Sequence, residues 1–142
     1  MAVYSLAVRT TDTTINHAAV ELYTAATCAI KVWEIGLTQT VGTSVAWGIG
    51  RPAAQGITPV AAVFQAEQAT SDPAAKTNLS LSWGTSPSAP TAYLRRFFTL
   101  NQIGVGFILT FPKGLYVPAS ASLVVFNITA SVASDVYFVI DE

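Results

Sequence analysis

Charged residues are scarce in this sequence, and their scarcity excludes several classes of protein. Only 11% of the 142 residues are charged while 51% are hydrophobic, whereas an ordinary soluble protein has about 25% charged residues. No apolar stretch is long enough to span a membrane, so we expect no membrane contact. Apolar side chains in such excess indicate that part of the surface packs against other protein chains. The composition therefore predicts a component of an assembly.

Clustered positive charge is also missing. Seven Lys and Arg balance eight Asp and Glu to give a net charge of −1, and no basic run is longer than the pair Arg95-Arg96. Binding to a phosphate backbone needs a basic patch or stripe. We therefore predict no nucleic-acid partner.

Residues for metal or nucleophilic chemistry are few. One cysteine, Cys28, and one histidine, His17, provide neither an internal disulfide nor a four-ligand zinc site. A hydrolytic triad needs a central histidine. His17 follows polar residues just before a predicted strand, which favours a histidine at the surface or at a strand end over a catalytic one. Among the carboxylates only Glu34, beside Trp33, has an aromatic neighbour for a sugar site, and the strand pattern favours a solvated Glu34. We expect a buried Cys28 and no enzyme activity, cofactor or metal.

Alternating apolar and polar residues run along most of the chain, broken by Gly, Pro, Ser and Thr clusters. This period of two is typical of strands with one buried face, and Asp135–Ile140, apolar on both faces, predicts a central or covered strand. The nine predicted strands are Val3–Val8, Ala18–Tyr23, Ala29–Ile35, Val45–Ile49, Leu79–Trp83, Leu94–Leu100, Val105–Phe111, Leu123–Thr129 and Asp135–Ile140. The pattern indicates one all-β domain over residues 1–142, a sandwich or a barrel.

One segment fits two structures. Residues 59–69 are rich in alanine, and Pro59 is placed where a first helical turn accepts proline. Val60, Val63 and Phe64 match helical spacing only in part, and the flanking residues suit an extended chain equally well. We favour an extended excursion over a helix for residues 56–76.

The C-terminal third contains a pattern found in a known group of proteins. It consists of Leu94–Phe98, then Ile103–Pro118 with the run Phe111-Pro112-Lys113-Gly114-Leu115-Tyr116-Val117-Pro118, then Ser122–Ile128 and Asp135–Glu142. Over residues 92–142 this resembles small jelly-roll structural proteins of tailed bacteriophages, in which such a corner separates two core strands. The resemblance implies a single-domain jelly-roll β-sandwich of antiparallel strands, here with a strand-forming N-terminal arm.

Some proteins of this group are capsid decoration, or cement, proteins that sit as trimers on the outer shell. The resemblance therefore implies a non-enzymatic virion protein on the capsid surface, with its own copies (a homotrimer) and the major capsid protein as partners. The start of the chain lacks the pattern of a secretory signal, so we expect synthesis and folding in the host cytoplasm. Two alternatives stay open, a phage tail or fibre component and a carbohydrate-binding jelly-roll module for host attachment. A cupin enzyme is disfavoured because it would need a His and Glu cluster.

Eight residues are candidates for contacts with another subunit or with the capsid. The first and last strands offer edges with which neighbours can pair. Arg95 and Arg96 point to opposite faces of one strand, so one of them faces inward or into a contact, with a cross-strand ion pair as the alternative. Trp33, Trp47 and Trp83 serve as core residues, interface anchors or a sugar platform. The candidates are Val3, Tyr4, Leu6, Trp33, Trp47, Arg51, Arg95 and Arg96.

Overall fold

The computed structural model describes residues 2–10, 14–68, 71–130 and 132–142. These residues form β1 (Val3–Arg9), β2 (His17–Tyr23), β3 (Ile30–Gln39), β4 (Val45–Gly50), β5 (Val60–Val63), β6 (Gln65–Ala66), β7 (Asn78–Ser82), β8 (Tyr93–Thr99), β9 (Gly106–Val117), β10 (Ser122–Asn127) and β11 (Ser134–Asp141). The described part of the chain contains no helix that could cross a membrane.

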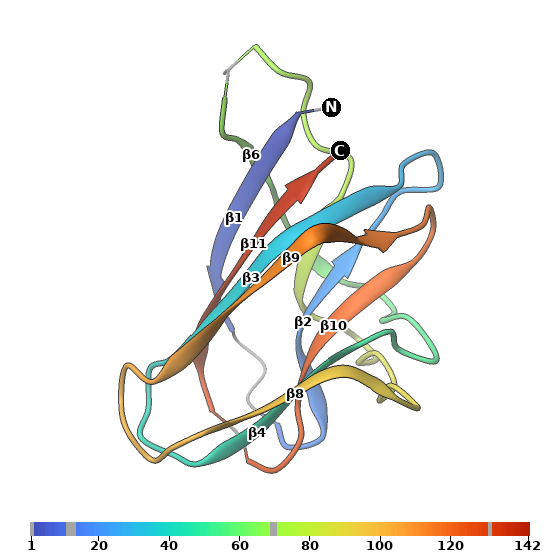
Figure 1. The fold of residues 1–142 in the computed structure, drawn as a ribbon. Coiled ribbons are helices and arrows are strands. Elements are labelled where there is room, and N and C mark those ends of the chain that lie inside the picture. The colour runs from blue at the N-terminus through green and yellow to red at the C-terminus, as the bar shows by residue number, and fades with distance from the viewer. Residues whose placement is uncertain (1, 11–13, 69–70, 131) are drawn as a thin grey trace.

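The strands form two antiparallel sheets packed face to face (Figure 1). One sheet has the order β6-β1-β11-β3-β9 and the other β5-β7-β2-β10-β4-β8. Eight of the strands pair like the two arms of one long hairpin that has been rolled up. In this arrangement β1 pairs with β11, β2 with β10, β3 with β9 and β4 with β8. This nested pairing across two sheets is the jelly-roll arrangement. The predicted antiparallel β-sandwich is confirmed.

The core lies between the sheets and is made by the inward positions of the alternating strands. Phe138 and Ile140 of β11, Val125 of β10 and Trp47 of β4 have no exposed surface. The indole Nε1 of Trp47 donates a hydrogen bond to Thr99 Oγ1 at 3.1 Å, so its one polar group is satisfied inside the core. Each large apolar side chain buried in this way contributes about 1.5–3 kcal/mol to folding.

The nine predicted strands are all present, and β11 is central, as its two apolar faces predicted. The segment with two possible structures forms β5 and β6 and contains no helix among its described residues. Residues 69–70 of that segment lie outside the described residues. The preference for an extended excursion is therefore confirmed for the part that the structure describes, and the helical alternative is wrong there.

Two expectations about the ends of strands need correction. The run that was expected to be a corner between two strands lies inside β9, where Phe111–Gly114 bulges out between Thr110 and Leu115, which pair with Glu34 and Val32. Gly114 has φ +69°, a backbone angle that residues with a Cβ rarely adopt, so the glycine makes this bulge possible. Proline does not end the strand because β9 is an edge strand, where a missing donor costs no pairing.

The predicted N-terminal arm is a strand of the sandwich itself. β1 pairs with β11 from Val3 opposite Asp141 to Arg9 opposite Asp135, and the two chain ends lie near each other (Figure 1). β11 lies between β1 and β3, so it offers no edge to a neighbour. The expectation that both terminal strands present free edges is therefore wrong for β11, and β1 is partly covered by β6.

Residues 51–92, which join β4 to β8, close one side of the sandwich. They add β5 and β7 to one sheet beside β2, and β6 to the other sheet beside β1. Phe64, the single residue between β5 and β6, is only 3% exposed and packs in the main core. Because the chain crosses here from one sheet to the other, we call β5, β6 and the described residues 67–68 and 71–76 the closed side.

Candidate assembly surface

The opposite side of the sandwich has no covering segment. β8 is the edge of the six-stranded sheet and β9 is the edge of the five-stranded sheet, and no described strand pairs with their outer edges. Figure 1 shows the two strands joined by a single loop, residues 100–105. We call β8, this loop and β9 the open side. Unpaired backbone groups along such edges are available to strands of other chains.

Inward-facing side chains of the open side are only partly covered. Phe97 of β8 and Phe107 of β9 stack with their ring centroids 4.3 Å apart and an interplanar angle of 23°. Both rings, and Leu109 and Phe111 of β9, pack against the core yet remain partly exposed. The inward residues of the central strands are fully buried. Among the described residues the apolar interior reaches solvent at the sheet edges, along β8 and β9 here and at Leu6 and Val8 of β1 on the other side.

Four large apolar side chains add to this exposure. Phe98 on β8 is 65% exposed, Ile108 on β9 is 66% exposed, and Leu100 and Ile103 in the loop are 62% and 75% exposed. None of these side chains stabilises the isolated chain by burial. Phe98 and Ile108 point to the outer faces of different sheets, since their neighbours Phe97 and Leu109 face the core, and Leu100 and Ile103 lie in the loop between the two strands. Exposed apolar side chains beside unpaired strand edges are typical of an interaction surface.

The open side also carries positive charge without nearby carboxylate partners. Arg95 Nη1 donates to the carbonyl of Leu94 at 2.7 Å, and the Arg96 guanidinium lies 5.7 Å from the centre of the Tyr93 ring. Arg51, from the residues after β4, donates through Nη2 to the carbonyl of Tyr116 on β9 at 2.8 Å. Among the described residues the one ion pair is Arg9 with Asp135. The three arginines therefore have no carboxylate partner in the described chain.

Tyr4 and Trp47, two of the eight predicted contact residues, are core residues. Tyr4 is 4% exposed and its hydroxyl donates to the carbonyl of Pro73 at 2.8 Å, and Trp47 is completely buried. Trp47 therefore has no surface to offer a partner in this fold. Tyr4 lines a surface hollow despite its low exposure, so its contact with a partner stays a prediction. The alternation of the sequence placed both correctly in strands but did not distinguish the covered face from the exposed one.

Arg95 and Arg96 differ from the expectation in another way. By register Arg95 lies opposite buried Ile49 and so belongs to the inward face. It is nevertheless exposed, as is Arg96, because β8 is an edge strand and a long side chain leaves the interior at the rim. Neither arginine is buried and neither forms the cross-strand ion pair considered as the alternative. Together with Arg51 they form a cationic rim of the open side.

The other three predicted contact residues lie elsewhere. Val3 and Leu6 are partly buried in β1, Leu6 against the core. Trp33 is partly exposed on the outer face of the five-stranded sheet, with the Lys31 ammonium 6.0 Å from the ring centre. These residues are not part of the open side.

The outer face of the five-stranded sheet holds an aromatic residue beside a carboxylate. The Tyr137 hydroxyl donates to Glu34 Oε1 at 2.6 Å, which with burial raises the pKa of Tyr137 to about 12. The ring lies over Gly36, where any Cβ would overlap it, so the glycine is required by this close approach. Trp33 lies on the same strand, three residues before Gly36. The other two tryptophans are not here, so the three do not form a shared sugar platform.

Glu21 is a buried carboxylate that the sequence did not single out. It is 2% exposed on β2, and its carboxylate accepts hydrogen bonds from Trp83 Nε1 at 2.9 Å and from the Gly56 N–H at 3.2 Å. These bonds attach both arms of the 51–92 segment to the outer face of the six-stranded sheet. Within the described residues no three His, Cys, Asp or Glu side chains gather as a metal site. Glu21 therefore has an evident structural role.

The apolar loop of the open side was also missed by the strand pattern, because that pattern treats residues between strands as polar turns. The distribution of acidic residues nevertheless pointed to this part of the chain. Residues 73–134 contain no Asp or Glu, although they make up over a third of the chain, and β8, the loop and β9 all lie within them.

No protein-family model matches the chain, and no curated protein or solved structure matches it either.

Proposed function

We propose that this protein is a capsid decoration protein of a tailed phage, which binds the outer surface of the head and stabilises it without catalysing a reaction. The observation that carries the proposal is the open side, where two unpaired strand edges, four exposed apolar side chains and unpaired arginines occur together. The resemblance to phage jelly-roll proteins covers residues 92–142, which include both edge strands. In this proposal the partners are further copies, as a homotrimer, and the major capsid protein.

The open side supplies three kinds of interaction for such a role. Backbone groups of β8 and β9 pair with a neighbouring strand. Burial of Phe98, Leu100, Ile103 and Ile108 contributes about 25 cal/mol for each Å² removed from water. The arginines select a partner of opposite charge and set the orientation of docking more than they add affinity. Many copies on one shell turn a modest contact into a large total stabilisation.

Sedimentation with phage heads tests the proposal. The purified chain is mixed with heads of the phage that encodes it, or with unassembled capsid protein, and pelleted. We expect saturable binding to heads, none to free capsid protein, and a loss of binding in the double variant Phe98→Asp/Ile103→Asp. The matched control is Ile15→Asp, which changes an apolar side chain that is 46% exposed outside the open side. Failure of the unchanged chain to bind heads would contradict the proposal.

A carbohydrate-binding module is the second candidate, because Tyr137, Glu34 and Trp33 place aromatic rings and a carboxylate on an open sheet face. A glycan screen decides between the two. Saturable sugar binding that Trp33→Ala abolishes and Phe98→Asp leaves intact would favour the module. Antibody labelling of virions distinguishes the remaining alternative, since a tail or fibre component would be labelled away from the head.

A further inference from the structure

Charge is distributed unequally between the two sides of the sandwich. The open side, the neighbouring strand β3 and the residue that follows β4 carry five cations and no Asp or Glu except Glu34, whose carboxylate accepts the Tyr137 hydroxyl. The cations are Lys31, Arg51, Arg95, Arg96 and Lys113. The closed side and the chain ends beside it carry Glu67, Asp72, Asp141 and Glu142, with Lys76 as their one described cation.

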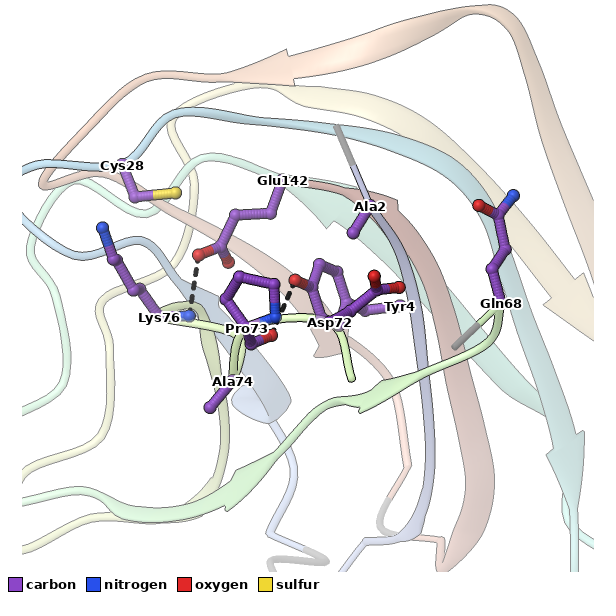
Figure 2. A pocket seen from close by; sticks show the side chains of 9 residues that line it. All are labelled: Ala2, Tyr4, Cys28, Gln68, Asp72, Pro73, Ala74, Lys76 and Glu142. Atoms are coloured by element: carbon purple, nitrogen blue, oxygen red, sulfur yellow. Dashed lines mark hydrogen bonds between the residues drawn. The ribbon is translucent and has the colours of Figure 1, made fainter. Parts of the chain in front are cut away.

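Two of these acidic residues, Asp72 and Glu142, lie at a hollow of about 490 Å³, which Figure 2 shows from close by. Asp72 and Glu142 line it together with the cation Lys76, and the Glu142 carboxylate accepts the backbone N–H groups of Lys76 and Thr77 at 2.7 and 3.0 Å. The negative charge is felt by the neighbouring Tyr4, since burial and then Glu142 and Asp72 raise its pKa. A cationic side chain therefore finds a favourable potential here.

The two charged sides cannot neutralise each other within one chain. β9 and β6 are the opposite edges of the five-stranded sheet, and β8 and β5 are the opposite edges of the six-stranded sheet. Both sides also expose apolar residues, since on the closed side Val60 of β5 is 62% exposed and Val63 is 50% exposed. The closed side of one copy therefore matches the open side of another in charge and in apolar character.

We infer that copies of this chain bind head to tail, with the open side of one copy on the closed side of the next. Contact between two open sides would bring Arg95 and Arg96 of both copies together, and this like-charge repulsion disfavours a two-fold dimer through that surface. A head-to-tail contact is heterologous and repeats until a ring closes. This inference deepens the proposed function, on which it rests, by naming the faces that join decoration subunits. The open side is then covered inside the ring, and the assembled ring is what binds the head.

Charge reversal on each side, followed by reversal of both, tests the contact. Arg95→Glu/Arg96→Glu makes the open side acidic, and Glu67→Lys/Asp72→Lys makes the closed side basic. Light scattering over a range of concentrations should show an assembly of the unchanged chain and a dissociation constant about tenfold higher for each double variant. The fourfold variant has complementary sides again, so it should associate nearly as tightly as the unchanged chain. Circular dichroism checks that every variant keeps its sheets.

Lys76→Glu is the matched control, because it reverses a charge on the closed side but makes that side more acidic. It should leave association unchanged or tighten it. A monomeric unchanged chain, double variants that associate as before, a fourfold variant that stays dissociated, or a weakened Lys76→Glu variant would each overturn the inference.

The same samples separate this inference from the proposed function. A monomer that still pellets with phage heads would overturn the contact between copies and leave the decoration role standing. An assembly that behaves as expected on charge reversal but never binds heads would support the contact and overturn the decoration role.

Discussion

The closed side and the open side of the sandwich contain similar residues but meet solvent differently. On the closed side the 51–92 segment crosses between the sheets and Phe64 is 3% exposed, whereas on the open side Phe98 is 65% exposed. The whole chain exposes 6794 Å², close to the roughly 7,000 Å² expected of a folded monomer of this mass. The chain is thus about as compact as an ordinary monomer of its size. Exposed large apolar side chains occur on both sides, and the open side differs in that they lie beside two uncovered strand edges.

The largest difference between the two sides should appear in stability. Phe64→Ala removes a ring from the core and should lower the free energy of unfolding by about 3–5 kcal/mol. Phe98→Ala removes a ring that packs against little and should change it by no more than about 0.5 kcal/mol. Urea unfolding at a concentration where the chain is monomeric measures both. Equal losses would show that the open side is as well packed as the closed one.

The next largest effect on stability should come from the hydrogen bonds that attach the 51–92 segment to the six-stranded sheet. Glu21→Ala leaves Trp83 Nε1 and the Gly56 N–H without their acceptor, and an unsatisfied buried donor costs about 1–3 kcal/mol. Urea unfolding should show that loss, and the fluorescence of the folded variant should shift to the red as Trp83 becomes wetter. Glu67→Ala removes an exposed carboxylate and serves as the control with unchanged stability. No loss in Glu21→Ala would mean that the segment is held by packing alone.

Apolar residues on both sides should affect association more than folding. Ile103→Asp on the open side and Val60→Asp on the closed side change residues that are 75% and 62% exposed, so each should alter the free energy of unfolding by at most about 0.5 kcal/mol. Each should weaken self-association several-fold, because a charge is then buried without a partner. Light scattering and urea unfolding on the same variants measure the two effects. A variant that unfolds more easily without associating less would contradict the assignment of these residues to a contact.

The smallest effect concerns a site away from both sides. The hydrogen bond to Glu34 and burial raise the pKa of Tyr137 from 10.0 to about 12. Because the folded-state pKa lies above the unfolded value, this contribution to stability is full below pH 10.0 and is lost as the pH rises towards about 12. Ultraviolet titration of the unchanged chain against Tyr137→Phe isolates this tyrosine. The pKa of Tyr137 should be the same in the monomer and in the assembly. A change in this pKa on assembly would place the contact on this outer face instead.

Much of the fold could be predicted from the sequence, because alternation has a direct physical cause. A strand with one covered face needs apolar residues at every second position, and Leu79–Ser82 shows it plainly, whereas Asp135–Ile140 is apolar on both faces, as a central strand requires. The bulge at Phe111–Gly114 was harder, since proline and glycine are typical of turns and also of irregular edge strands. Only the pairing of β9 with β3 shows that the strand continues beyond it.

The candidate site could be predicted only in part. Arg51, Arg95 and Arg96 were identified, but their joint position depends on β8 and β9 being the edges of two sheets, which is a property of the topology and not of any local pattern. Trp47 was misplaced, and Tyr4 lies deeper than expected, for the same reason, because alternation does not tell which face is covered. The exposed loop residue Ile103 was missed because turns are expected to be polar, and Leu100 was predicted as the end of a strand but lies in the loop.

Hydrogen exchange along the chain tests the central claim, that the open side is the contact surface, most directly. Backbone amides are compared by mass spectrometry at a dilution where the chain is monomeric and in its assembled state. The account predicts new protection over residues 93–117, with a smaller gain over residues 60–76 and none over the central strands β10 and β11. Protection confined to the outer face of the five-stranded sheet, or no protection beyond that of the monomer, would contradict it.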